Sequence, residues 1–106
     1  MHRIRLFAIC AALAASSPAL HAAGNAAKGK EVFEQCGVCH NADSEEKKMG
    51  PGLKGLFKHE KMTNGKKPTE ANVKAKIEEG GNGMPAYKDM LSDTEKDDLI
   101  AYLKTL

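Results

Sequence analysis

The chain has 106 residues, which is enough for one domain. Sixteen Lys and Arg against fourteen Asp and Glu give a formal net charge of +2 at pH 7. Both arginines lie at the start of the chain, and residues 24–106 hold fourteen lysines and fourteen acids, so this part is formally neutral. Its overall charge therefore gives no argument for a nucleic acid or an anionic lipid as partner.

The first 23 residues have the layout of a secretory signal peptide. Two arginines are followed by an apolar run over residues 6–15 and by small residues at the end of this segment. The apolar run is too short to span a bilayer in the usual way, although an uncleaved membrane anchor is the alternative. We expect residues 1–23 to be removed and residues 24–106 to be periplasmic or secreted, without a membrane span.

A first helix is predicted over residues 26–35. Asn25 suits the N-cap, and Val32 and Phe33 supply an apolar side. Gly29 lies four residues before Phe33 and therefore on the same face. Because glycine inside a helix costs about 1 kcal/mol relative to alanine, it suggests close approach by another element. A tolerated surface glycine is the alternative.

The segment Cys36-Gly37-Val38-Cys39-His40 follows this helix. Two thiols two residues apart, with a histidine directly after the second, are the attachment pattern of a c-type haem. Each Cys sulfur bonds to one former vinyl group of the porphyrin, so Cys36 and Cys39 must face the same edge of the ring. His40 then supplies an imidazole nitrogen to the iron.

Two other uses of this cysteine pair are weighed against haem. A thiol–disulfide pair of the thioredoxin kind needs a strand–helix setting, and no strand-like run precedes Cys36. A zinc site needs four ligands, usually from two separated pairs. His59 is the other histidine of residues 24–106, and this part of the sequence has no second cysteine pair. Covalent haem is therefore the favoured interpretation.

A loop rich in glycine covers residues 50–57. Glycine lets the backbone approach a flat surface closely, and Pro51 offers a carbonyl but no N–H. If this carbonyl accepts from the ring N–H of His40, it fixes the tautomer and strengthens the ligand. A plain turn residue is the simpler interpretation of Pro51. Three apolar residues of the loop are then expected to line the haem pocket: Leu53, Leu56 and Phe57.

A second helix is predicted over residues 70–79, with Thr69 as N-cap and two glycines after its end. Val73 and Ile77 make a short apolar stripe, which we assign to the core.

A third helix is predicted over residues 93–105. Ser92 and Glu95 have the spacing of a capping box. The helix has an apolar face made of Leu99, Ile100, Tyr102, Leu103 and Leu106. No alternating segment of strand length stands out. The predicted fold is therefore all-α, with three or more helices wrapped around one covalent haem.

The sixth ligand of the iron has five candidates: Met49, His59, Met62, Met84 and Met90. A lone methionine in a loop usually packs. Met84, however, lies between two helices in a glycine-rich segment, and Pro85 stiffens its backbone. A thioether ligand favours ferrous iron and raises the potential. We favour Met84, while Met62, His59 and a vacant site remain alternatives.

The charges are unevenly distributed along the chain. Residues 47–67 hold seven lysines against one glutamate, and residues 70–98 hold four lysines against eight acids. The basic segment is either a solvated loop or a docking patch.

Taken together, these motifs resemble a small class I cytochrome c, of the bacterial monohaem kind and similar in plan to mitochondrial cytochrome c. The resemblance covers nearly all of residues 25–106. It rests on the segments 36–40, 50–57, 83–85 and 98–104. Gly52 departs from it, because the mitochondrial family usually has Asn there. By this resemblance, Gly29 and Phe33 form the Gly/aromatic pair that crosses the last helix near Tyr102.

The resemblance implies a one-electron carrier and not an enzyme. Haem c would be held through Cys36 and Cys39, with His40 and Met84 on opposite faces of the iron. We expect a monomer that meets other redox proteins transiently at an exposed haem edge. The alternatives are a haem-based sensor or small-ligand binder with a weak sixth ligand, the carrier subunit of a larger redox enzyme, and a thiol oxidoreductase.

Overall fold

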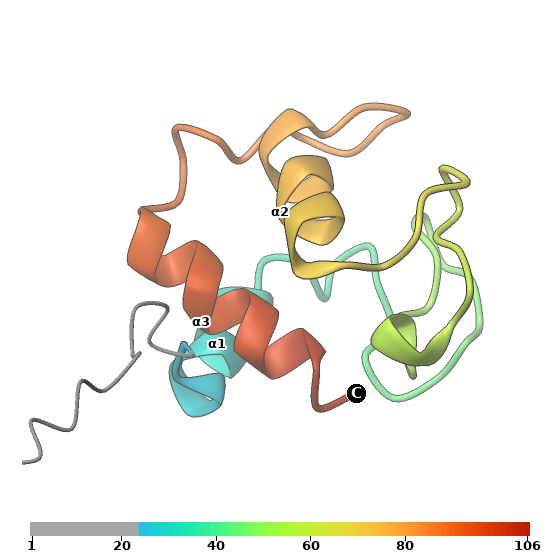
Figure 1. The fold of residues 1–106 in the computed structure, drawn as a ribbon, viewed down its shortest axis with the longest axis horizontal. Helices are drawn as coiled ribbons and strands as arrows, with labels where there is room; N and C mark the ends of the chain where they lie inside the picture. The colour runs from blue at the N-terminus through green and yellow to red at the C-terminus, as the bar shows by residue number, and fades with distance from the viewer. Residues whose placement is uncertain (1–23) are drawn as a thin grey trace, which may run out of the picture.

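The computed structural model describes residues 24–106, and the predicted signal peptide lies outside them. This part contains three α-helices, α1 (Ala26–Phe33), α2 (Glu70–Glu79) and α3 (Asp93–Leu103), and one 3-10 helix, η2 (Leu56–Lys58) (Figure 1). Residues 24–106 form no β-strand beyond one isolated bridge. The predicted all-α fold class is confirmed.

Each α-helix begins where the sequence predicts. The side chains of Asn25 and Thr69 accept from the backbone N–H three residues further on, at 3.0 and 3.1 Å. Ser92 and Glu95 form the full capping box, each side chain accepting from the backbone N–H of the other. These bonds satisfy N–H groups that have no partner inside the helix.

Two helices end earlier than predicted. Helix α1 ends at Phe33, because the N–H of Cys36 donates to the Phe33 carbonyl at 2.8 Å in a tighter turn. Helix α3 ends at Leu103, and the N–H of Thr105 closes a similar turn on the Tyr102 carbonyl at 2.9 Å. The first of these turns starts the motif that carries the cysteines.

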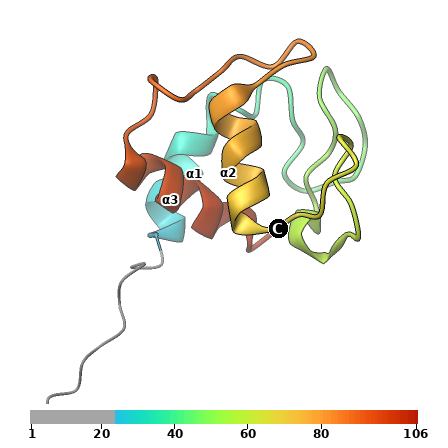
Figure 2. The same cartoon turned by 45° about the horizontal axis from the view of Figure 1, so that its top comes forward.

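Helices α1 and α3 cross in direct contact (Figures 1 and 2). A Cβ atom at Gly29 would overlap the backbone carbonyl of Asp98 and lie 2.8 Å from the Cβ of Tyr102. Beside this crossing, the rings of Phe33 and Tyr102 pack at a centroid distance of 5.3 Å and an angle of 53°. The close approach predicted at Gly29 is confirmed.

Gly29→Ala is expected to destabilise the protein by about 2 kcal/mol, because the added methyl group pushes the two helices apart. By helix propensity alone, alanine is more stable than glycine by about 1 kcal/mol, so the sign of the change in the free energy of unfolding tests the close contact between the helices. Urea unfolding of the haem-loaded protein measures it. Lys30→Ala, on the exposed side of the same helix, should stay within about 0.5 kcal/mol. A gain in stability for Gly29→Ala would contradict the contact.

The hydrophobic core is built by the three α-helices and the α2–α3 connection. Its buried members are Phe33, Val73, Ile77, Tyr87, Leu91, Leu99, Ile100 and Leu103. Two charged side chains are buried as well, Lys96 and Asp98. Residues 41–68 contain only η2 and form a wall of loops beside the helices (Figure 1). None of the helices in the described part has the length and apolarity needed to cross a membrane.

Candidate functional site

A cavity of about 640 Å³ lies between the loops of residues 41–68 and the helices. This volume is typical of a cofactor site. Most of its lining is apolar, with Phe33, Leu53, Leu56, Met62, Val73, Ile77, Tyr87, Leu99 and Leu103. Cys36, Cys39, His40 and Met84 line it too. The structure therefore brings these four predicted site residues to one apolar cavity.

The turn after α1 sets the directions of the motif side chains. The N–H groups of Cys39 and His40 both donate to the Cys36 carbonyl, at 3.1 and 3.0 Å. This helical turn keeps the two cysteines close to one another. Both side chains are half-buried, and neither cysteine forms a disulfide.

His40 is oriented by the loop that covers it. Its Nδ1 lies 2.8 Å from the Pro51 carbonyl oxygen, which can only accept, so Nδ1 carries the proton. Nε2 is then left with a lone pair for a metal. A Cβ atom at Gly50 would lie 2.5 Å from the Cε1 of His40, so the loop backbone packs against the ring. The structure thus contains the predicted hydrogen bond between His40 and the Pro51 carbonyl, and Pro51 is more than a plain turn residue.

The backbone at Gly52 leaves no room for a larger residue such as Asn. A Cβ atom there would come within 2.5 Å of the Glu45 carbonyl carbon and overlap the Ser44 carbonyl oxygen. The N–H of Leu53 donates to the Asn41 carbonyl at 2.8 Å, which holds residues 52–53 against residues 41–45. The space that an Asn side chain would need is filled by the chain itself.

Met84 is presented by a tight hairpin. Gly81 and Met84 exchange backbone hydrogen bonds of 2.9 and 3.1 Å. Asn82 and all three glycines of residues 80–83 have positive φ, which glycine adopts without strain. A Cβ atom at Gly80 would lie 2.5 Å from the Met84 carbonyl oxygen, so the hairpin folds closely onto the end of α2. Met84 itself is half-buried against the core.

Three of the four other candidates for the sixth ligand also line the cavity: Met49, His59 and Met62. His59 Nε2 lies 3.2 Å from the Lys54 carbonyl oxygen and 3.4 Å from Glu45 Oε1. The imidazole of His59 is therefore engaged by the loop wall. Met90 is absent from the cavity lining and is 63% exposed.

The predicted pocket lining needs one correction. Leu53 and Leu56 line the cavity, whereas Phe57 packs against the hydrophobic core without lining it. With three residues per turn in η2, neighbouring side chains point about 120° apart, so Leu56 and Phe57 face different ways. Conversely, Val73 and Ile77 were assigned only to the core and also line the cavity. In a small domain whose interior is filled by a cofactor, core residues also contact the cofactor, and this argument could have predicted that Val73 and Ile77 line the cavity.

The cavity chemistry argues against the two other uses of the cysteine pair. Burial, and to a lesser degree Cys39, raises the pKa of the Cys36 thiol, whereas reactive cysteines have lowered pKa values. Within residues 24–106, no three His, Cys, Asp or Glu side chains are grouped as a metal site would need. The donors present are two thiols, one oriented imidazole and one thioether in an apolar cavity. This set fits a covalently held haem.

Comparison with known proteins identifies relatives of this domain. A family model described as cytochrome c matches residues 26–106. Cytochrome c2 of Rhodospirillum rubrum is 32% identical over 125 aligned positions, covering 92% of this chain and 93% of that protein. Cytochrome c6 of a Synechocystis species is 34% identical, covering 76% of this chain and 65% of that protein. The match to the whole helical domain, together with the motif of Cys36, Cys39 and His40, shows that this chain belongs to the cytochrome c family and carries a covalently bound haem c.

Proposed function

We propose that this cytochrome c is a periplasmic one-electron carrier whose iron is held between His40 and Met84. Membership of the cytochrome c family makes it an electron carrier and not an enzyme. The observation that carries the ligand assignment is the hydrogen bond from His40 to Pro51, which leaves Nε2 free to bind iron on a cavity that Met84 also lines.

Each residue of the site has a separate task in this proposal. Cys36 and Cys39 would hold the porphyrin covalently through thioether bonds. His40, held by Pro51, would supply an imidazole nitrogen to the iron, and the soft Met84 sulfur would favour the ferrous state. The apolar lining keeps water from the iron. Haem supplies the reversible change between ferric and ferrous iron.

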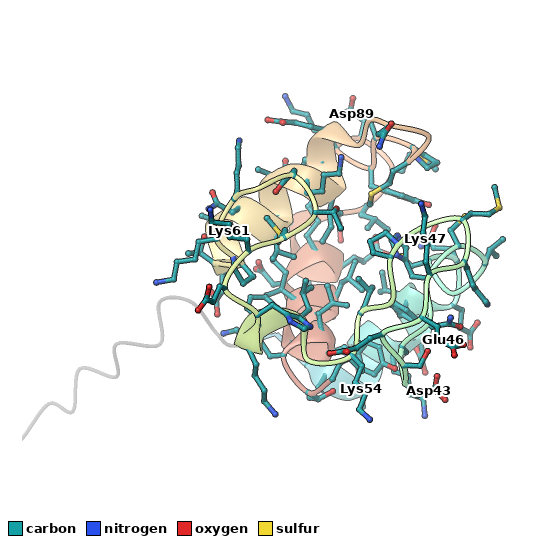
Figure 3. The ribbon with its side chains drawn as sticks, turned by 90° about the vertical axis from the view of Figure 1, so that its right-hand side faces the viewer. Asp43, Glu46, Lys47, Lys54, Lys61 and Asp89 are labelled. Carbon is teal, nitrogen blue, oxygen red and sulfur yellow. The ribbon has the colours of Figure 1, made fainter. Side chains whose placement is uncertain are left out.

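The proposed periplasmic location rests on residues 1–23, which have the layout of a signal peptide. The proposed docking surface rests on the distribution of charged side chains. Lys47 and Lys61 line the cavity, and Lys54 lies at the lower edge of the loop wall, on the same side as Asp43 and Glu46 (Figure 3). We propose that a monomer docks transiently here, at the haem edge. The excess of lysines in this segment would steer it toward acidic redox partners.

This surface predicts a salt-dependent reaction. The second-order rate of electron transfer to an acidic redox protein should fall about tenfold as salt rises from low to physiological levels. Stopped-flow mixing measures it. Lys54→Glu should slow the reaction at low salt, whereas Lys28→Glu, on α1, carries the same charge change away from this face. Equal effects of the two variants would exclude the loop face as the docking site.

Visible spectra of the ferric and ferrous protein test the carrier function, after extraction of any loosely bound haem. Retained haem with the long-wavelength band of sulfur-ligated ferric iron is the expected result. Retained haem that is high-spin and binds carbon monoxide would favour a sensor instead. Complete loss of haem would overturn the proposal.

A further inference from the structure

We infer that Lys96 is a positioning residue for Met84: from α3, its ammonium group holds the backbone that follows Met84 and so keeps the thioether at the iron. This inference rests on the ligation by Met84 proposed above. It adds a residue that does not line the cavity.

The first observation is the burial of Lys96 and its set of partners. Its side chain is only 4% exposed. Its Nζ donates to the Lys88 carbonyl oxygen at 2.8 Å and lies 3.4 Å from Glu78 Oε2 and 3.8 Å from Asp93 Oδ1. One cation of α3 thus joins the end of α2 to the chain four residues after Met84.

The burial separates this contact from an ordinary surface ion pair. Exposed pairs of Lys and Glu contribute little, because water screens them and both side chains stay mobile. A lysine is rarely buried unless it is paired, and removing one partner of a buried pair leaves the other uncompensated. Glu78 is itself 26% exposed at the side chain, so the pair lies at the rim of the core. The local geometry at Lys88 therefore depends on Lys96.

The second observation is that both backbone polar groups of Lys88, its N–H and its carbonyl, are hydrogen-bonded. Its N–H donates to the Glu78 backbone carbonyl at 3.2 Å, and its carbonyl accepts from Lys96. The preceding N–H, of Tyr87, donates to the Ile77 carbonyl at 2.9 Å. Glu78 thus contacts both Lys88 and Lys96, which closes a ring of three residues from three parts of the chain.

This ring is the anchor on the C-terminal side of Met84. On the N-terminal side the hairpin bonds with Gly81 hold the residue. Between the two anchors, Pro85 has no N–H to donate. Without Lys96, the Lys88 carbonyl loses its donor and the Glu78 carboxylate its cation. The segment should then open more often while the rest of the fold stays closed.

Binding of imidazole to the ferric haem-loaded protein tests this, since imidazole binds iron only when Met84 leaves it. Lys96→Met keeps most of the side-chain volume and removes the ammonium group. We expect its imidazole dissociation constant to fall about tenfold relative to the unmodified protein. The long-wavelength sulfur band follows the displacement of Met84 directly.

Two further variants make the result specific. Asn25→Ala removes the N-cap of α1 and lowers global stability without touching the Met84 segment, so its imidazole affinity should stay within about twofold. Glu78→Gln keeps Lys96 but removes the carboxylate, so imidazole should bind more tightly than to the unmodified protein, by a smaller factor than in Lys96→Met. If Lys96→Met does not fold, this variant tests the inference.

Several outcomes would overturn the inference. Equal imidazole affinities for Lys96→Met and Asn25→Ala would reduce Lys96 to a general stabiliser. An imidazole affinity of Lys96→Met equal to that of the unmodified protein would also contradict the inference. If Lys96→Met does not fold, an unchanged imidazole affinity of Glu78→Gln would contradict it. If the unmodified ferric protein lacks the sulfur band, the ligation by Met84 fails and this inference fails with it. If the band is present and the Lys96 variant is unchanged, only the role of Lys96 fails.

Discussion

Replacing Met84 with alanine should leave the haem attached and open the sixth position of the iron. Cys36, Cys39 and His40 still hold the group, so haem content is expected to stay unchanged. The ferric form should lose its sulfur band and become high-spin, and the ferrous form should bind carbon monoxide in about one-to-one ratio. The potential should fall, because a thioether favours ferrous iron. Visible spectra and a redox titration measure these changes.

Met62→Ala is the matched control for this experiment. Met62 is a half-buried methionine that lines the same cavity and packs against the same core. Its replacement should cost some stability and keep the sulfur band. If Met84→Ala keeps both spectra unchanged and Met62→Ala loses the band, then Met62 is the ligand and the proposal for Met84 is wrong.

The double variant Cys36→Ala plus Cys39→Ala is expected not to fold stably. The cavity of about 640 Å³ would then have no covalently held group to fill it. The apolar side chains that line it would then face water instead of the porphyrin. A domain of this size buries little apolar surface with its own side chains, so it has little folding free energy to offset this loss.

Far-UV circular dichroism and urea unfolding of this double variant would show the loss of helix and of a cooperative transition. Val38→Ala is the control inside the same motif, because the Val38 side chain is 71% exposed and fills no part of the core. It should keep haem, helix content and cooperativity. A double variant that unfolds cooperatively without haem would contradict the role of the cofactor as part of the core.

The helices were predictable because their starting signals are local. Asn25, Thr69 and Ser92 each bond to an N–H three residues further on, so a few adjacent residues contain the whole interaction. The haem motif is equally local. Gly29 could be interpreted correctly because glycine inside a helix needs a reason, and the carbonyl of Asp98 provides it.

Other features depend on contacts between distant parts of the chain. The bond from His40 to Pro51 could not be chosen from the sequence, because the direction of a carbonyl depends on how the loop folds back. Lys96 lies in a run of charges typical of a solvated helix start, and nothing nearby indicates that Glu78 and Lys88 enclose it. Phe57 and Leu56 are neighbours of similar character, and only η2 decides which of them meets the cavity.

The direct packing of α1 on α3 has a consequence for how the protein is made. Helix α3 follows α1 in the chain only after the loops of residues 41–68 and α2, and the two helices meet without these loops between them. During synthesis or vectorial passage through a membrane, Cys36 and Cys39 therefore emerge long before α3 can cover the first helix. Haem can then be attached to the two cysteines while the chain is still open, and the later packing of α3 on α1 closes the domain.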